Sequence, residues 1–148
     1  MTFRLPVPAE RLQANPNVRR DVRRVALRRG PLIYCVEEAN NPGGPVQTLA
    51  LPRYGPLKAT WRDDLLGGTM TLTVNAERLV PGDESGSLYS TTPPERRNVP
   101  LTALPYHFWA NREPGSMQVW IARRSSERHP RVYVWSWRVG LVPPTAAF

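Results

Sequence analysis

The chain has 148 residues and a formal net charge of +8, a length that fits one domain with a single core. No apolar run approaches the length of a membrane span, and the start "MTFRLPVPAERLQ" lacks the charged and apolar regions of a secretory signal. A single cysteine excludes an internal disulfide and is compatible with a reducing compartment. We therefore expect a soluble, cytoplasmic protein with no membrane partner.

The positive charge is carried by arginine, since Lys58 is the only lysine. The densest group is "VRRDVRRVALRR", residues 18–29, where arginines occur in pairs. One hypothesis is a basic face for nucleic acid. Because arginines are scattered along the whole chain, we favour the alternative, a solvated edge or a surface that faces another domain.

The first part of the chain predicts short strands. Pro6 and Pro8 interrupt the first extended piece and suit a sheet edge. The segments "RRVALRRG" and "PLIYCVEE" predict two strands divided by a turn or bulge at Gly30-Pro31. Residues 32–36 are apolar without interruption, so we expect both faces of this strand to be covered.

A loop, "ANNPGGPVQ", separates these strands from three more, in "TLALP", "LKATWR" and "GTMTLTVNAERL". The last has the clearest strand pattern, because Met70, Leu72 and Val74 alternate with polar residues. Gly67-Gly68 predicts a turn before it.

The remaining chain begins with a polar link over residues 80–100, for which we predict no regular structure. "LTALPYHFWAN" and "MQVWIARR" then predict a strand pair joined by "REPGS", and "RVYVWSWRV" predicts a final strand. No segment keeps a helical period over three turns. The pattern therefore predicts an all-β fold, an antiparallel, jelly-roll-like β-sandwich with little or no helix.

The catalytic candidates in the sequence are few. Cys35 would need a base to act as a nucleophile, and the only histidines are His107 and His129. His107 lies among aromatic residues, so we disfavour a Cys35–His107 dyad. Glu37 and Glu38 are adjacent on a strand and should point to opposite faces, which prevents a converging acid/base pair.

Metal and cofactor motifs are missing as well. One cysteine and two distant histidines do not make a zinc pattern, and there is no glycine-rich phosphate loop. We therefore predict no catalytic, metal or cofactor-binding residues in this chain.

The aromatic residues suggest a binding role instead. Trp109, Trp120 and Trp135 would stack on sugar rings if they were exposed, as in carbohydrate-binding modules. Because tryptophan buries a large area and suits strands, we favour packing of these rings in the core.

Three stretches also carry a resemblance to a known family. "VALRRGPLIYCVEEANN" is similar to "VAL-x-RGPLVYC-x-E" in the C-terminal β-sandwich region of glycoside hydrolase family 127, the β-L-arabinofuranosidase-like proteins once called domain of unknown function 1680. "RLPVPAERLQANPNVRRDVRRVAL" resembles the family's lead-in to that segment. "LTALPYHFWANREPGSMQVWI" resembles its "L-x-A-IPYYAWANRGPG-x-M-x-VWI".

The resemblance implies that the family's catalysis lies elsewhere. Its members are expected to have an (α/α)-barrel with a cysteine nucleophile in a zinc site and a glutamate acid/base. This chain has no paired cysteines, and Cys35 matches a sandwich strand. The resemblance thus implies no catalysis and no cofactor for this chain, with zinc expected only in the catalytic domain of a parent hydrolase.

We therefore expect residues 1–148 to form a single accessory domain, with 1–17 a candidate last strand and linker of a preceding sandwich and 122–148 a divergent tail. The leading hypothesis is a non-catalytic, structural domain whose partner is the catalytic barrel or a second copy. The first alternative is a binding module for plant-type arabinose-containing glycans, and the weaker alternative is an arginine-rich nucleic-acid binder. A cut piece, a truncated reading frame and a stand-alone protein all fit this sequence.

Overall fold

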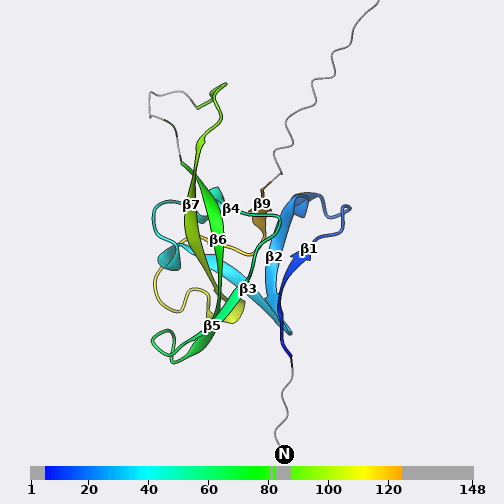
Figure 1. The fold of residues 1–148 in the computed structure, drawn as a ribbon. Helices are drawn as coiled ribbons and strands as arrows, with labels where there is room; N and C mark the ends of the chain where they lie inside the picture. Colours follow the sequence, from blue (N-terminus) through cyan, green and yellow to red (C-terminus); the bar gives the residue numbers. More distant parts are fainter. Residues whose placement is uncertain (1–5, 81, 83–87, 125–148) are drawn as a thin grey trace, which may run out of the picture.

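The computed structural model describes residues 6–80, 82 and 88–124, and these residues form nine strands and four short 3-10 turns with no α-helix (Figure 1). The strands are β1 (Ala9–Gln13), β2 (Arg24–Arg29), β3 (Leu32–Glu37), β4 (Leu49–Leu51), β5 (Lys58–Arg62), β6 (Thr69–Val80), β7 (Glu95–Pro105), β8 (Met117–Gln118) and β9 (Ile121–Arg123). The 3-10 turns are η1 (Arg19–Asp21), η2 (Glu38–Asn40), η3 (Val46–Thr48) and η4 (Tyr106–Phe108). The all-β prediction is confirmed. Among the described residues, no helix has the length and apolar character needed to cross a membrane.

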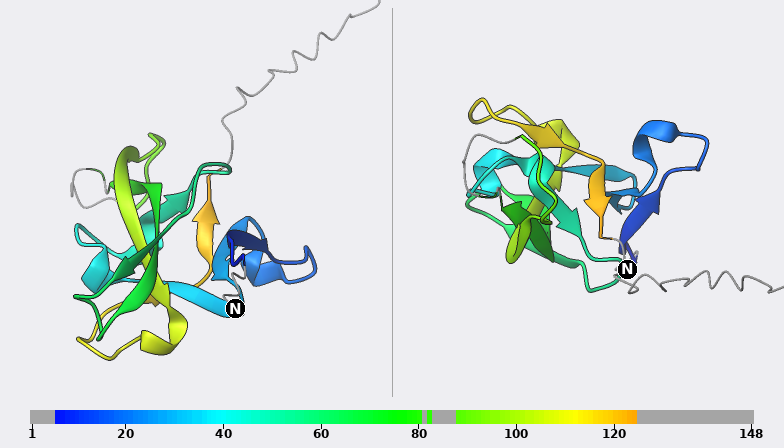
Figure 2. Two further views of the ribbon diagram at one scale, coloured as in Figure 1. Left: turned by 60° about the horizontal axis from the view of Figure 1, so that its bottom comes forward. Right: turned by 90° about the horizontal axis from the view of Figure 1, so that it is seen from above.

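Six of these strands pair in a closed ring. The order is β2, β9, β4, β6, β7 and β3, and β3 pairs again with β2 (Figure 2). β1 and β5 flank the ring, on β2 and β6 respectively. The architecture is therefore a small barrel and not the two-layer sandwich that we predicted. Both folds have one inward face per strand, so alternation in the sequence does not separate them.

The ring of strands closes because two strands, β9 and β3, pair with different parts of the same edge of β2. Val25 pairs with Gln13 of β1 and with Ile121 of β9, whereas Leu27 pairs with Arg11 of β1 and with Tyr34 of β3. A strand residue has one partner on each side, so β9 and β3 share the edge opposite β1. β9 in turn runs parallel to β4, and this pairing joins the two sides of the ring.

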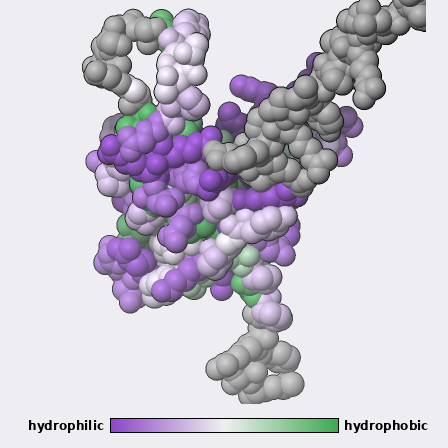
Figure 3. Space-filling view, turned by 45° about the horizontal axis from the view of Figure 1, so that its top comes forward, coloured by the Kyte–Doolittle hydropathy of each residue, from purple (hydrophilic) through white to green (hydrophobic). Residues whose placement is uncertain are grey.

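The longest hairpin, β6–β7, pairs from Leu72 and Ala103 to Val80 and Glu95, and its far end projects from the barrel (Figure 1). Residues 95–100, which we predicted to be irregular, are thus part of a strand. Their polar sequence reflects solvent exposure of this ribbon, and the face of the molecule seen in Figure 3 is mostly hydrophilic. The prediction for β6 is confirmed, since Leu72 and Val74 are buried on one face.

The C-terminal strand pair differs from the prediction. β7 ends at Pro105 and the chain turns through η4, so "LTALPYHFWAN" is a strand only in its first half. β8 pairs with β3, and β9 pairs with β2 and β4. Pairing between distant segments left no local signal in the sequence. β1 pairs with β2 of the ring, and the predicted strand at 131–139 lies outside the described residues.

The core fills the inside of the barrel. It is built from inward residues of the ring strands and of η3, all nearly inaccessible: Val25, Leu27, Tyr34, Val36, Val46, Leu49, Leu51, Leu72, Val74, Ala76, Leu101, Ala103 and Ile121. Residues 34–37 are buried in succession, which confirms that both faces of the middle of β3 are covered, although Leu32 at its start is exposed.

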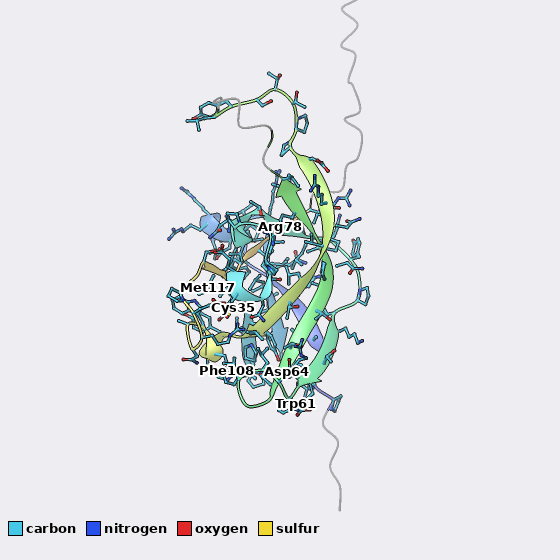
Figure 4. All side chains as sticks on the ribbon, turned by 90° about the vertical axis from the view of Figure 1, so that its left-hand side faces the viewer. Cys35, Trp61, Asp64, Arg78, Phe108 and Met117 are labelled. Atoms are coloured by element: carbon cyan, nitrogen blue, oxygen red, sulfur yellow. The ribbon has the colours of Figure 1, made fainter. Side chains whose placement is uncertain are left out.

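Two buried polar side chains hold the loop that follows β3. The Asn41 amide donates to the carbonyls of Glu37 and Thr102, and its oxygen accepts the Thr102 N–H, so that this side chain replaces a strand partner for β7. Arg78, which extends from β6 (Figure 4), donates to the carbonyls of Asn41 and Gly44. Together they fix the loop against the hairpin.

Candidate functional site

Cys35 lies inside the protein and has no catalytic environment (Figure 4). Its thiol is fully buried, and burial, with a smaller effect of the Glu37 carboxylate, raises its pKa to about 12. A thiol with so high a pKa is protonated at neutral pH and is a poor nucleophile. The cysteine is a small core residue on β3.

The two histidines do not supply a base to this thiol. His107 is exposed in η4, where its ring lies against Phe108 with a centroid distance of 4.2 Å. His129 lies outside the described residues. Within the described part of the chain, no group of three or more histidine, cysteine, aspartate and glutamate side chains is arranged to hold a metal ion.

The segments "YCVEEAN" and "WANREPGSM" meet at one end of β3. Arg112 donates to the carboxylate of Glu37 at 2.6 Å and also to the side chain of Asn40. Glu38 accepts a hydrogen bond from the hydroxyl of Ser116 at 2.7 Å, and their backbones also pair. We call this contact region the motif junction. It explains why two of the resembling stretches occur together: each supplies the other's polar partners.

A small cavity at the motif junction is lined by Glu37, Glu38, Trp109, Glu113 and Ser116, among others. β3 ends at Glu37 and η2 begins at Glu38, and the two carboxylates bind different partners, Arg112 and Ser116. The volume of this cavity, about 10 Å³, is enough for a single water molecule and too small for a sugar. The glutamates therefore serve as structural acceptors here.

The candidate sugar-stacking residues occupy different positions. Trp109 is 44 % exposed, and its ring stacks near that of Tyr106 with a centroid distance of 6.3 Å. Trp120, in the connection between β8 and β9, is half-buried. Trp135 lies outside the described residues. Trp61, which the sequence analysis did not single out, is the most exposed of the described tryptophans at 55 %.

Trp120 and Tyr106 both line a broad groove of about 790 Å³. We call it the arginine–aromatic groove; its other lining residues come from the segment around η1 and from β8 and its connection to β9, namely Asn17, Val18, Arg19, Arg20, Asp21, Arg24, Met117, Gln118 and Val119. Arg24 donates to the carbonyl of Trp120 at 3.1 Å, which ties the start of β2 to this connection. The sequence analysis singled out the arginine-rich segment and Trp120 separately, but it did not predict that they lie close together.

Known proteins with these features identify the family. Residues 9–122 match the profile of the glycoside hydrolase family 127 C-terminal domain. The chain belongs to this family. A non-reducing end β-L-arabinofuranosidase of Bifidobacterium longum subsp. longum is 36 % identical over 127 residues, which are 83 % of this chain and 19 % of the relative. The resemblance drawn from the motifs is thus confirmed for the GH127 C-terminal domain.

Solved structures of the same family share the fold. A GH127 β-L-arabinofuranosidase from Geobacillus stearothermophilus has 42 % identity and a TM-score of 0.72, over 80 % of this chain and 19 % of that protein. A second GH127 β-arabinofuranosidase has 32 % identity and a TM-score of 0.70, over 80 % of this chain and 18 % of its own. The GH127 C-terminal domain described here thus spans about a fifth of the length of its relatives.

Proposed function

We propose that this chain is a non-catalytic, structural domain of a β-L-arabinofuranosidase-like glycoside hydrolase, and that it packs against a catalytic (α/α)-barrel or a second copy. The observation that carries the proposal is the match to the C-terminal domain of the family, over only about a fifth of each relative. The buried thiol of Cys35, and the use of Glu37 and Glu38 as hydrogen-bond acceptors for Arg112 and Ser116, support a non-catalytic role.

The edge strand β5 is our candidate packing face. Among the described strands it pairs only with β6, so its other edge carries free backbone groups. Trp61 projects from it at the lower end of the molecule in Figure 4, with its indole N–H bonded to Asp63 at 2.5 Å and its ring against Gly68. A held, half-exposed tryptophan beside a free strand edge is typical of a surface that another domain covers.

Light scattering on the purified chain over a wide concentration range tests the packing face. We expect self-association and binding of a hydrophobic dye, both reduced by Trp61→Ser. Leu88→Ser is the matched control, because Leu88 is exposed in the loop that follows the other end of β6. A monomer without dye binding at every concentration would refute the packing proposal. Hydrolysis of an aryl arabinofuranoside by this chain would refute the non-catalytic role.

A second candidate function is the binding of arabinose-containing glycans. It is favoured by one observation, the presence of Tyr106 and Trp120 on the walls of the same groove. Aromatic faces beside polar side chains are suited to sugar rings. Titration with arabino-oligosaccharides should change tryptophan fluorescence; no response at millimolar sugar would exclude this function.

A further inference from the structure

The arginine–aromatic groove has a marked charge asymmetry. Arg19, Arg20 and Arg24 line it, whereas Asp21 is the only acidic residue among the lining residues. We propose that this groove binds an acidic oligosaccharide, one whose sugar rings carry carboxylates. The inference rests on the glycan-binding candidate above and names its ligand class.

The three arginines are available to a ligand. None of them forms an ion pair with a described residue, whereas Arg28, Arg62, Arg97, Arg112 and Arg124 are each paired with a carboxylate. A guanidinium group presents a planar fork of N–H donors that matches a carboxylate in two-point contact. The groove therefore presents three guanidinium groups that have no carboxylate partner among the described residues.

One of the three is also held in place. The hydrogen bond from Nη1 of Arg24 to the Trp120 carbonyl fixes its guanidinium beside the aromatic wall. Arg24 itself is exposed and lines the groove. A donor that is fixed before binding loses less conformational entropy when the ligand arrives.

The aromatic side of the groove supplies the surface for the sugar ring. Tyr106 is 47 % exposed, and its stacking near Trp109 orients its ring. Asn17 adds a side-chain amide that suits hydroxyls. The volume of about 790 Å³ lies in the usual range for small-molecule sites. The carboxylates of an acidic glycan would bind the arginines, and its sugar rings would stack on the aromatic side chains. Because the relatives of this chain are glycoside hydrolases, we favour such a glycan over nucleic acid as the ligand.

The test compares two oligosaccharides on the full chain. Trigalacturonate, as the acidic probe, should bind at least about tenfold more tightly than a neutral arabino-oligosaccharide at low salt, as two charge-assisted hydrogen bonds would give. The preference should shrink as ionic strength rises. Tryptophan fluorescence and calorimetry measure the binding, and thermal unfolding reports on the fold of each variant.

Substitutions distinguish the contribution of the arginine charges to sugar affinity from the contribution of aromatic stacking. Arg19→Gln with Arg20→Gln should remove most of the preference for trigalacturonate, whereas Arg53→Gln with Arg97→Gln, the same change of charge at exposed sites away from the groove, should keep it. Tyr106→Ala should weaken both sugars.

Four outcomes would overturn the inference, and they are distinguishable. Equal affinity for the two sugars refutes the acidic ligand but leaves glycan binding in place. No binding of either sugar by the folded chain refutes both. Binding that the groove variants do not change places the site elsewhere. Displacement of trigalacturonate by single-stranded DNA at lower concentration assigns the groove to nucleic acid.

Discussion

The guanidinium of Arg112 donates a hydrogen bond at 2.6 Å to the carboxylate of Glu37, which lies 75 residues earlier in the chain. The Glu37 side chain is only 9 % exposed, so this pair partners one oxygen, Oε2, of a carboxylate that water barely reaches. The motif junction is therefore held by polar contacts as well as by pairing of β3 with β7 and β8.

Removal of Arg112 should be costly. Arg112→Ala leaves the buried Glu37 carboxylate without its cation, and we expect a loss of about 2 kcal/mol in the free energy of unfolding, less than for a fully buried pair because Arg112 is partly exposed. Urea unfolding measures it. Arg97→Ala breaks a solvent-exposed pair with Glu95 and should leave the free energy of unfolding nearly unchanged. Equal effects of the two substitutions would contradict this account.

The side chain of Asn41 should be indispensable to the loop after β3. Asn41→Ala leaves the Thr102 N–H and two carbonyls without their partner, and we expect a cost of about 2 to 3 kcal/mol. Asn41→Asp keeps the acceptor but loses both donated bonds, so it should also destabilise. Asn98→Ala, at an exposed position of β7, is the control. If Asn41→Ala left the free energy of unfolding unchanged, the Asn41 side chain would not be needed to hold the loop, and this prediction would be wrong.

The thiol of Cys35 should be unreactive in the folded protein. Its pKa of about 12 and its full burial predict that thiol reagents modify it only as fast as the protein opens, with rapid labelling in urea. The folded state favours the neutral thiol, so its contribution to stability is present below the ordinary thiol pKa and is lost as the pH rises toward 12. Rapid labelling at pH 8 without denaturant would contradict this.

Ser116 should control the titration of Glu38. The Ser116 hydroxyl, followed by its backbone N–H, lowers the pKa of the Glu38 carboxyl, and Ser116→Ala should move that pKa upward. The carboxylate form is favoured in the folded state, so its contribution to stability is present above the ordinary glutamate pKa and is lost as the pH falls through the lowered value. Carbon-13 NMR of the carboxyl groups measures the shift. Ser90→Ala should leave it unchanged, and an unchanged Glu38 in Ser116→Ala would refute the assignment.

The sequence by itself determined the all-β class, the family and most of the strands. Alternation at Leu72 and Val74 placed β6, and the unbroken apolar run before Glu37 marked a strand covered on both faces. Gly30 marked the turn between β2 and β3, where its positive φ and the close approach of Val7 leave little room for a side chain. These are local properties, because period and turn chemistry depend on neighbours in the chain.

Only the tertiary structure decided the closure of the barrel and the assembly of the sites. Pairing of β9 with β2 and β4 closes the ring, yet its three residues carry no pattern that names these partners. In the same way, Glu37 meets Arg112, and Trp120 lies beside Arg24 and in one groove with Tyr106, across long separations in the sequence. Contacts of this kind depend on strand register and loop paths set by the whole fold, and no local period encodes them.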